Sequence, residues 1–363
     1  TKYIIVRTIW VFLVLLTILT LNFTLLKLAP EYPPTEVKQQ QLYYSRQVFD
    51  GYMEKDRINQ SDPISELFVR EVYQQTKGGI ASECFSGGSW YCPLSNDDSY
   101  VNLHTPVPVS VQYFNWLYNI VTDWNWGYTT RVQVNNPVFD VLKDRIPVTL
   151  RLNLVALFFY IPIGFGLGIV AALKKNSVAD NMISLGVMIF ISVPSFVTMT
   201  LLLWVFGYQL EWLPTQFPGA DIEDIWVQFK GMVLPVLGLS FGAIAGLTRL
   251  TRAELTEVLT SEFLLLARTK GLTRQQAVIR HAMRNSMVPL VPSIIGSFVG
   301  LLSGSVVIEI IYSIPGTGRL YIKAMTRGAY DYNLILGTTA FYTIISLFAV
   351  LLVDLSYGLV DPR

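Results

Sequence analysis

Charged residues are scarce in this chain of 363 residues, and the scarcity sets the class of protein. Asp, Glu, Lys and Arg make up 15% of the sequence, against about 25% in ordinary soluble domains. Hydrophobic residues make up 52%, and the mean hydropathy is +0.43. This composition excludes an ordinary soluble globular protein and predicts a membrane protein. The net charge of +1, without a long basic run, excludes a typical nucleic-acid-binding protein.

Groups for metal binding and catalysis are equally few. The sequence holds two cysteines and two histidines. We expect His104 on the outer side of the membrane and His281 on its cytoplasmic side, so that they share no site. Phosphate-binding loops of the Gly-x-x-x-x-Gly-Lys-Ser/Thr type, Gly-x-Ser-x-Gly elbows and His-Glu-x-x-His zinc motifs are all missing. We therefore expect no catalytic residue, no metal site and no cofactor in this chain.

Six long apolar segments approach the roughly 20 residues that a helix needs to cross a bilayer. We interpret the first as a retained anchor, because it is long and Lys27 stands where a cleaved signal peptide needs a small residue. We predict an all-α polytopic membrane protein with an N-terminal transmembrane helix (1–29), an insert (30–148) and a five-helix core (149–363). The six segments cover residues 9–29, 150–173, 182–208, 232–247, 287–311 and 334–355.

The distribution of Lys and Arg predicts the orientation of these spans. The loop 249–286 holds seven basic residues, and Lys174 and Lys175 follow the second span. Placing them in the cytoplasm puts both termini there and residues 30–148 outside. The loop 312–333 disagrees, because it falls outside and carries three basic residues.

The insert 30–148 is acidic, with nine basic and 14 acidic residues. We expect it to be mainly helical, with helices over 35–57, from Ser61 onward and over 109–125. It is a candidate for docking an external protein or for covering the outer mouth of a transport path. Its aromatic residues suit either a membrane-interface belt or a small core within the insert: Trp116, Trp124 and Trp126.

The cysteines of the insert, Cys84 and Cys92, have seven residues between them. Outside the membrane, in an oxidising compartment, such a pair is expected to form a disulfide. Free thiols and metal ligation remain alternatives.

Ionisable residues lie only near the ends of the predicted spans, as Glu309 does in the fifth, and the fourth span holds none. Charges within a membrane usually mark proton relays and ion pathways. Their absence argues against a proton-driven or sodium-driven carrier. If the protein is a transporter, we expect its energy to come from another subunit.

Glycines recur at four-residue spacing in the fourth and fifth spans. Such ridges allow helix backbones to approach closely, which is typical of tight packing or of an interface that moves. The predicted helix-packing residues are Gly238, Gly242, Gly246, Gly296, Gly300 and Gly304.

The cytoplasmic loop 249–286 reads as two or three short helices hinged at Gly271, with Thr273 as the N-cap of the second piece. It is either a solvated connector that contacts anionic lipids or a docking helix for a cytoplasmic partner.

Four stretches carry a resemblance to a known family. They are Ala267–Gly271 followed by Arg280–Asn285, Tyr113–Gly127, the Pro-Gly-x-Gly segment within 309–320, and the ending 359–363. They resemble the inner-membrane permease subunits of bacterial ATP-binding-cassette importers, specifically the B-type dipeptide/oligopeptide permeases. The likeness covers 1–30 and about 107–363, while 31–106 does not match. The family's Glu-Ala-Ala start reads Leu265-Leu266-Ala267 here.

The resemblance implies a type I importer permease fold in the bacterial inner membrane, and membrane lipid around it. It also implies a second homologous permease, two cytoplasmic ATPase subunits that bind ATP and magnesium, an extracytoplasmic binding protein and a peptide substrate. The implied ATPase-coupling residues are Glu262, Leu264, Ala267, Arg268, Lys270 and Gly271. The implied outer gate or turn comprises Glu309, Pro315, Gly316 and Gly318.

Other readings stay open from the sequence. The same scaffold could carry nickel, glutathione or another small solute. A membrane-anchored receptor or assembly protein acting through the insert would need no ATPase partner. An intramembrane hydrolase needs paired polar groups, and Ser192, Ser195 and Ser303 have no base nearby in the pattern.

Overall fold

The computed structural model describes residues 2–28, 37–59, 100–219, 224–302, 306–326 and 330–360. These residues form two compact units. The first unit comprises residues 1–8, 145–319 and 344–363, and the second comprises 9–144 and 320–343. The division into 1–29, 30–148 and 149–363 stays a prediction.

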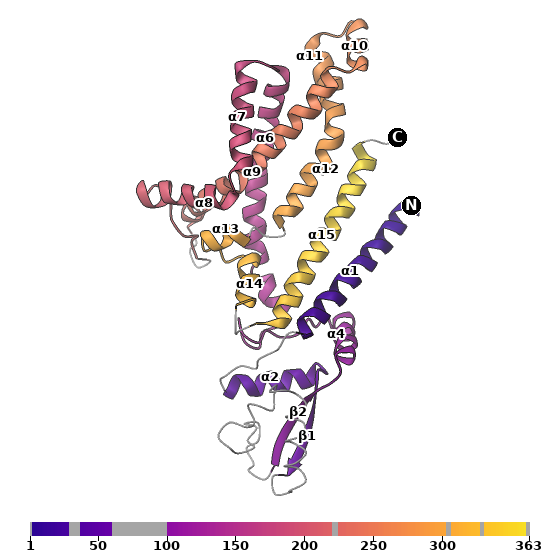
Figure 1. Ribbon diagram of the computed structural model, residues 1–363, viewed down its shortest axis with the longest axis vertical. Coiled ribbons are helices and arrows are strands. Elements are labelled where there is room, and N and C mark those ends of the chain that lie inside the picture. Colours follow the sequence, from indigo (N-terminus) through magenta and orange to yellow (C-terminus); the bar gives the residue numbers. More distant parts are fainter. Residues whose placement is uncertain are drawn as a thin grey trace. The chain divides into compact units, whose positions relative to one another are not determined.

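The first unit is helical throughout its described part (Figure 1). Its helix α9 packs along α6 and α7. The ends of two further helices, α1 (Lys2–Leu28) and α15 (Tyr332–Val360), are joined within this unit by an ion pair between Arg7 and Asp354. Its elements are α6 (Ile146–Leu173), α7 (Val178–Ser192), α8 (Ser195–Leu202), the π-helix η2 (Leu203–Gln209), α9 (Ile225–Leu259), α10 (Glu262–Thr269), α11 (Arg274–Ala277), the π-helix η3 (Val278–Ala282), α12 (Met283–Leu302), α13 (Val306–Ile311) and the start of α14 (Thr317–Ala324).

Two glycines of α6 bring it against α9. A Cβ on Gly164 would lie 3.1 Å from Cβ of Leu247, and a Cβ on Gly168 would lie 2.9 Å from the carbonyl oxygen of Thr248. The Thr248 hydroxyl donates a hydrogen bond of 3.1 Å to the Gly164 carbonyl. The small residues therefore allow a backbone contact that larger side chains would block.

Among the described residues, four helices are long and apolar enough to cross a membrane, or five if a bent pair counts as one span. The pair joins Val178–Ser192 to Ser195–Gln209 at 99°. The sequence predicted a single span over 182–208. The described helices bend within it at Pro194, which caps α8 in extended backbone. Helix α12 covers most of the predicted fifth span but is not among these four helices. The count of six spans therefore stays a prediction.

The second unit combines helices with one small sheet. Strand β1 (Met53–Asn59) pairs antiparallel with β2 (Tyr100–Pro106), with Met53 opposite Pro106. Its helices are α2 (Val37–Phe49), α4 (Val109–Asp123), α5 (Val138–Lys143) and parts of α1, α14 and α15.

The predicted helix over 35–57 was wrong beyond residue 49. Gly51 has a φ of +74°, which ends the helical path and turns the chain into β1. The predicted helix over 109–125 is confirmed as α4. The predicted helix start at Ser61 lies outside the described residues.

The core of the second unit decides between the two readings of the tryptophans. Trp116 is 1% exposed and packs with Trp126, Phe23 and Leu334. Trp124 is 57% exposed. Trp116 and Trp126 therefore belong to the core of this unit, and of the three tryptophans only Trp124 has an exposed ring.

Asp331 links distant parts of the second unit. Its carboxylate accepts backbone hydrogen bonds from Thr130, Arg131 and Val132 at 2.9, 3.0 and 3.3 Å, and another from Leu334 at the start of α15. Burial nevertheless raises the pKa of this carboxyl, because the loss of solvation outweighs the four donors.

Candidate functional site

Helix α10 has one buried face and one exposed face. Leu264 and Ala267 are buried, and Leu264 packs with Leu255 of α9 and Ala282 of η3. On the other side, Leu265 and Leu266 are 63% and 56% exposed. The helix is therefore anchored to the membrane helices through one face and leaves an apolar surface open through the other.

The charged residues predicted for ATPase coupling lie around this open surface. Glu262 stands in the first turn of α10 and Arg268 in its last turn, with Lys270 directly after it. All three are exposed. In Figure 1, α10 and α11 lie at one end of the first unit, while α13 lies far from them.

Gly271 makes the turn after α10. Its φ of +93° lies in the region that L-residues with a side chain avoid, and its N–H donates to the Arg268 carbonyl at 3.0 Å. In the part of the chain that the structure describes, no atom lies within 4 Å of the place a Cβ on Gly271 would take. The position needs glycine for its backbone conformation and not for space.

Thr273 begins the next helix with a capping box. The backbone N–H of Gln276 donates to Oγ1 of Thr273 at 3.3 Å, and the backbone N–H of Thr273 donates to Oε1 of Gln276 at 3.1 Å. The predicted N-cap is thus confirmed. From α11 the chain runs through η3 directly into α12, so no irregular linker separates the second piece of the loop from α12.

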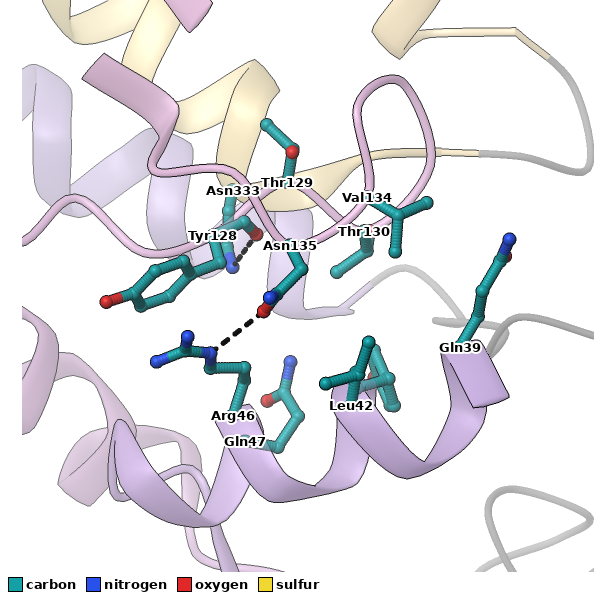
Figure 2. Close-up of a pocket in the computed structure, with 11 residues that line it drawn as sticks. Gln39, Leu42, Arg46, Gln47, Tyr128, Thr129, Thr130, Val134, Asn135 and Asn333 are labelled. Atoms are coloured by element: carbon teal, nitrogen blue, oxygen red, sulfur yellow. Dashed lines mark hydrogen bonds between the residues drawn. The ribbon is translucent and has the colours of Figure 1, made fainter. Parts of the chain in front are cut away.

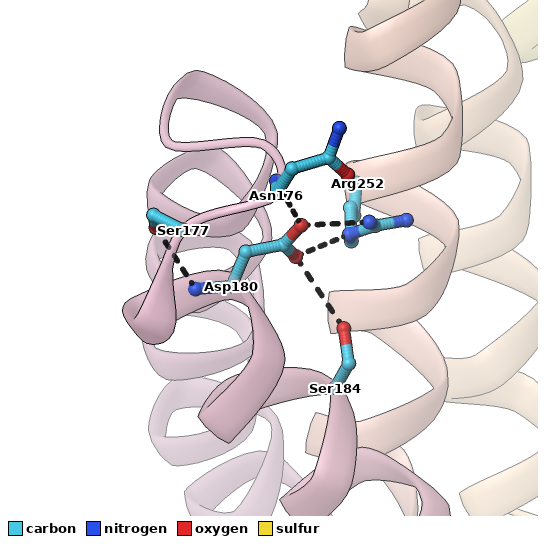
Figure 3. A network of polar contacts seen from close by, with 5 residues as sticks. All are labelled: Asn176, Ser177, Asp180, Ser184 and Arg252. Atoms are coloured by element: carbon cyan, nitrogen blue, oxygen red, sulfur yellow. Dashed lines mark hydrogen bonds and ion pairs between the residues drawn. The ribbon is translucent and has the colours of Figure 1, made fainter.

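A partly buried ion pair, which the sequence did not reveal, braces α7 against α9 (Figure 3). Asp180 is 1% exposed, and its carboxylate receives Nε and Nη2 of Arg252 at 2.6 and 2.8 Å. It also accepts from the backbone N–H of Asn176 and from the Ser184 hydroxyl. Ser177 caps α7 by accepting from the Asp180 N–H at 3.3 Å. The pair fixes α9 just before the loop that carries α10.

A second buried carboxylate organises the Pro-Gly-x-Gly segment. Glu309 accepts from the Thr149 hydroxyl at 3.0 Å and from the Arg319 N–H at 2.8 Å. The Thr317 N–H donates to the same Thr149 hydroxyl at 3.0 Å. Gly316 packs directly against the Glu309 carboxylate. Three of the predicted gate residues therefore meet around one carboxylate: Glu309, Gly316 and Gly318.

The predicted packing glycines have different surroundings. A Cβ on Gly238 would lie 2.7 Å from Cγ of Met199, so this glycine has a close helix neighbour. Within the described part of the chain, nothing lies within 4 Å of a Cβ on Gly242, Gly246 or Gly296. The structure does not describe the surroundings of Gly300 and Gly304.

Cys84 and Cys92 also lie outside the described residues, so their pairing stays a prediction. Among the residues that the structure does describe, no group of three or more His, Cys, Asp or Glu side chains could hold a metal ion.

A shallow pocket in the second unit lies between α2 and the segment after α4 (Figure 2). The guanidinium of Arg46 lies 3.7 Å from the centre of the Tyr128 ring, and its Nε donates to Oδ1 of Asn135 at 3.0 Å. Gln47 is buried at the floor. The space holds about one water molecule, so it is too small for a transported solute. The contacts of Arg46 around it anchor α2.

The chain belongs to a known family of membrane transport proteins. Residues 164–363 match the family described as the binding-protein-dependent transport system inner membrane component. It is therefore a permease subunit of an ATP-binding-cassette importer, and it is a transport subunit without an ATPase site of its own.

Curated relatives carry the comparison further. The chain is 35% identical over 261 residues to the dipeptide transport system permease protein DppB of Bacillus subtilis (strain 168), covering 72% of this chain and 80% of that protein. It is 33% identical to the oligopeptide transport system permease protein OppB of Escherichia coli (strain K12), covering 72% and 82%. Among solved structures, the inward-facing MetNI methionine transporter is similar over 61% of this chain and 97% of that chain, at 16% identity and a TM-score of 0.49.

Proposed function

We propose that this chain imports di- and oligopeptides as one of two permeases that together form the path across the bacterial inner membrane. The observation that carries the proposal is the 35% identity to a dipeptide transport permease over 72% of the chain. An extracytoplasmic binding protein delivers the peptide, and two cytoplasmic ATPase subunits bind ATP with magnesium and supply the energy. Both termini lie in the cytoplasm and residues 30–148 outside, as the Lys and Arg distribution predicts.

Helix α10 is the part that docks into the ATPase. Its exposed apolar face, formed by Phe263, Leu265 and Leu266, suits a hydrophobic groove. The charges of Glu262, Arg268 and Lys270 frame this face and set its register against a polar rim.

Motion of the docked helix reaches the membrane helices through packing. On the inner face of α10, Leu264 packs with Leu255 of α9 and with Ala282 of η3. Because η3 continues into α12, a displacement of α10 moves the ends of both helices. The Glu309 segment belongs to the opposite, outer side, where it acts as a gate or a rigid turn.

The proposal is tested by uptake in a strain that lacks this chain. We expect loss of labelled tripeptide uptake, restored by the wild-type chain. A gentle detergent purification should also recover a second permease, ATPase subunits and a binding protein. Restored uptake of nickel or glutathione with unchanged peptide uptake would assign another cargo. Recovery of the chain without ATPase subunits would refute the importer role.

A further inference from the structure

Helices α6, α9 and α12 surround a cleft of about 670 Å³ within the first unit. The same three helices pack around Tyr160, with Leu247 and Leu290 as its buried neighbours. The residues that line the cleft and matter here are Tyr160, Gly242, Gly246, Arg249, Ser293 and Ser297.

The glycines of the cleft differ from those that pack helices together. Gly164 and Gly168 of α6 meet α9, and Gly238 meets Met199. Gly242 and Gly246 are exposed, and nothing in the described part of the chain lies within 4 Å of a Cβ there. Their missing side chains widen the cleft and bring no described helix closer.

A buried hydroxyl faces this space without a partner. Tyr160 is 1% exposed, and its hydroxyl has no hydrogen bond of normal geometry within the described structure, although Ser297 lies near it. Buried polar groups in proteins are nearly always hydrogen-bonded. A solute or water in the cleft can supply the missing bond.

The serine hydroxyls offer acceptor sites beside it. Oγ of Ser293 donates to the Pro289 carbonyl at 3.0 Å, and Oγ of Ser297 donates to the Ser293 carbonyl at 2.8 Å. Each hydroxyl has used its proton and keeps lone pairs. The cleft thus places one hydroxyl donor beside two acceptors, which matches the C=O and N–H groups of a peptide bond.

Charge in the cleft has one sign. The described residues that line it include no carboxylate, and Arg249 is the only charged one among them. Among the described residues, Arg249 has no ion-pair partner. A guanidinium binds a carboxylate with charge-assisted hydrogen bonds, so the cleft favours a solute with peptide groups and a free carboxylate.

We infer that this cleft is this chain's wall of the solute path. Hydroxyls of Tyr160, Ser293 and Ser297 hydrogen-bond the backbone of the passing peptide, and Arg249 attracts its carboxylate. Recognition is of the backbone, so side chains of different size are accepted. The inference rests on the proposed peptide import and names the residues that carry it out.

The first test narrows the cleft by Gly246→Leu in the full transporter, reconstituted in proteoliposomes with its binding protein. Gly186→Leu on α7 is the matched control, because Gly186 also has no atom within 4 Å of a Cβ and does not line the cleft. We expect tripeptide uptake to fall at least tenfold in Gly246→Leu and less than twofold in the control. ATPase activity and recovery of the second permease should match wild type in both.

The second test removes single groups without adding bulk. Ser297→Ala and Tyr160→Phe should each raise the KM for tripeptide uptake about three- to tenfold, with the maximal rate kept within twofold. Arg249→Gln should lower uptake of a free-acid tripeptide and leave its C-terminal amide unchanged.

Three results would overturn the inference. The first is equal uptake in Gly246→Leu and Gly186→Leu. The second is loss of the second permease from Gly246→Leu, which would make the cleft a packing surface. The third is an equal effect of Arg249→Gln on acid and amide. A wild-type complex that imports no peptide would instead overturn the proposed function and this inference with it.

Discussion

The carboxylate of Glu309 occupies the space that a side chain on Gly316 would need. The two residues lie seven positions apart, and Glu309 accepts from Thr149 and from the Arg319 N–H while Gly316 covers it. The Pro-Gly-x-Gly motif therefore has a steric cause in this chain. Glycine is required because a buried carboxylate lies beneath it.

Gly316→Ala should destabilise the protein by about 1–3 kcal/mol, the usual cost of overpacking a filled site. The methyl group would displace the Glu309 carboxylate from its donors. Thermal unfolding of the purified chain in detergent measures the effect, with Gly186→Ala as the control in open surroundings. Equal melting temperatures for the two variants would contradict the steric account.

Asp180→Asn should destabilise the first unit by about 1–2 kcal/mol, because it removes the charge that Arg252, itself 34% exposed, pairs with. The double variant Asp180→Asn with Arg252→Gln removes both charges, and we expect it to recover part of the loss. Melting temperatures of the two single variants and the double variant form the measurement. Simple addition of the single effects would show that the side chains act independently.

Gly271→Asp should uncouple the ATPases while the membrane helices stay folded. At a φ of +93° any side chain strains the backbone by about 1–2 kcal/mol, and the turn would relax and rotate α10. The readout is ATPase activity stimulated by loaded binding protein, compared with Thr269→Ala on the exposed side of the same turn. Full stimulation in Gly271→Asp would argue against docking through α10.

Stability of the second unit should respond to pH through two groups of opposite sign. Burial raises the pKa of Asp50 to about 6, from an ordinary value of 3.8. The folded state then binds more protons between these values, so this group's contribution falls as the pH rises from about 4 to 6. Burial lowers the pKa of His104 to about 4, so its contribution falls as the pH drops from 6.5 toward 4. The two slopes oppose each other.

The variant Asp50→Asn separates the pH dependence due to Asp50 from that due to His104. Relative to wild type, the variant should gain up to about 3 kcal/mol between pH 4 and pH 7, since two pKa units correspond to that energy. Unfolding of the intact chain in detergent at several pH values measures the difference. A difference between variant and wild type that does not change with pH would show that Asp50 has the same pKa in the folded and unfolded states.

Sequence predicted the local features of the coupling loop because their causes are local. The capping box at Thr273 and the turn at Gly271 depend on residues within three positions. It could not predict the pairing of Asp180 with Arg252, since those residues lie 72 positions apart and each looks like an ordinary helix-end charge. The strands were missed because their partners, 53–59 and 100–106, are separated by a long segment.

The Pro-Gly-x-Gly segment lies between these cases. Its glycines predicted a turn. The structure shows that they are needed because the Glu309 carboxylate fills the space beside them, where it also accepts a hydrogen bond from the Thr149 hydroxyl at the start of α6. A pattern of small residues indicates closeness without naming the neighbour. The same holds for the cleft glycines, whose sequence spacing equals that of a packing ridge and whose surroundings are open.

The contacts of Asp331 order the events of biosynthesis. The amides of Thr130 and Arg131 leave the ribosome about 200 residues before the carboxylate that receives them, and Leu334 and Leu336 of the core follow Asp331. The first half of this unit therefore waits, incompletely packed, while the intervening spans are made and inserted. A chain shortened before residue 331 would lack both the acceptor and part of the core, and would present quality-control proteases with an unfinished domain.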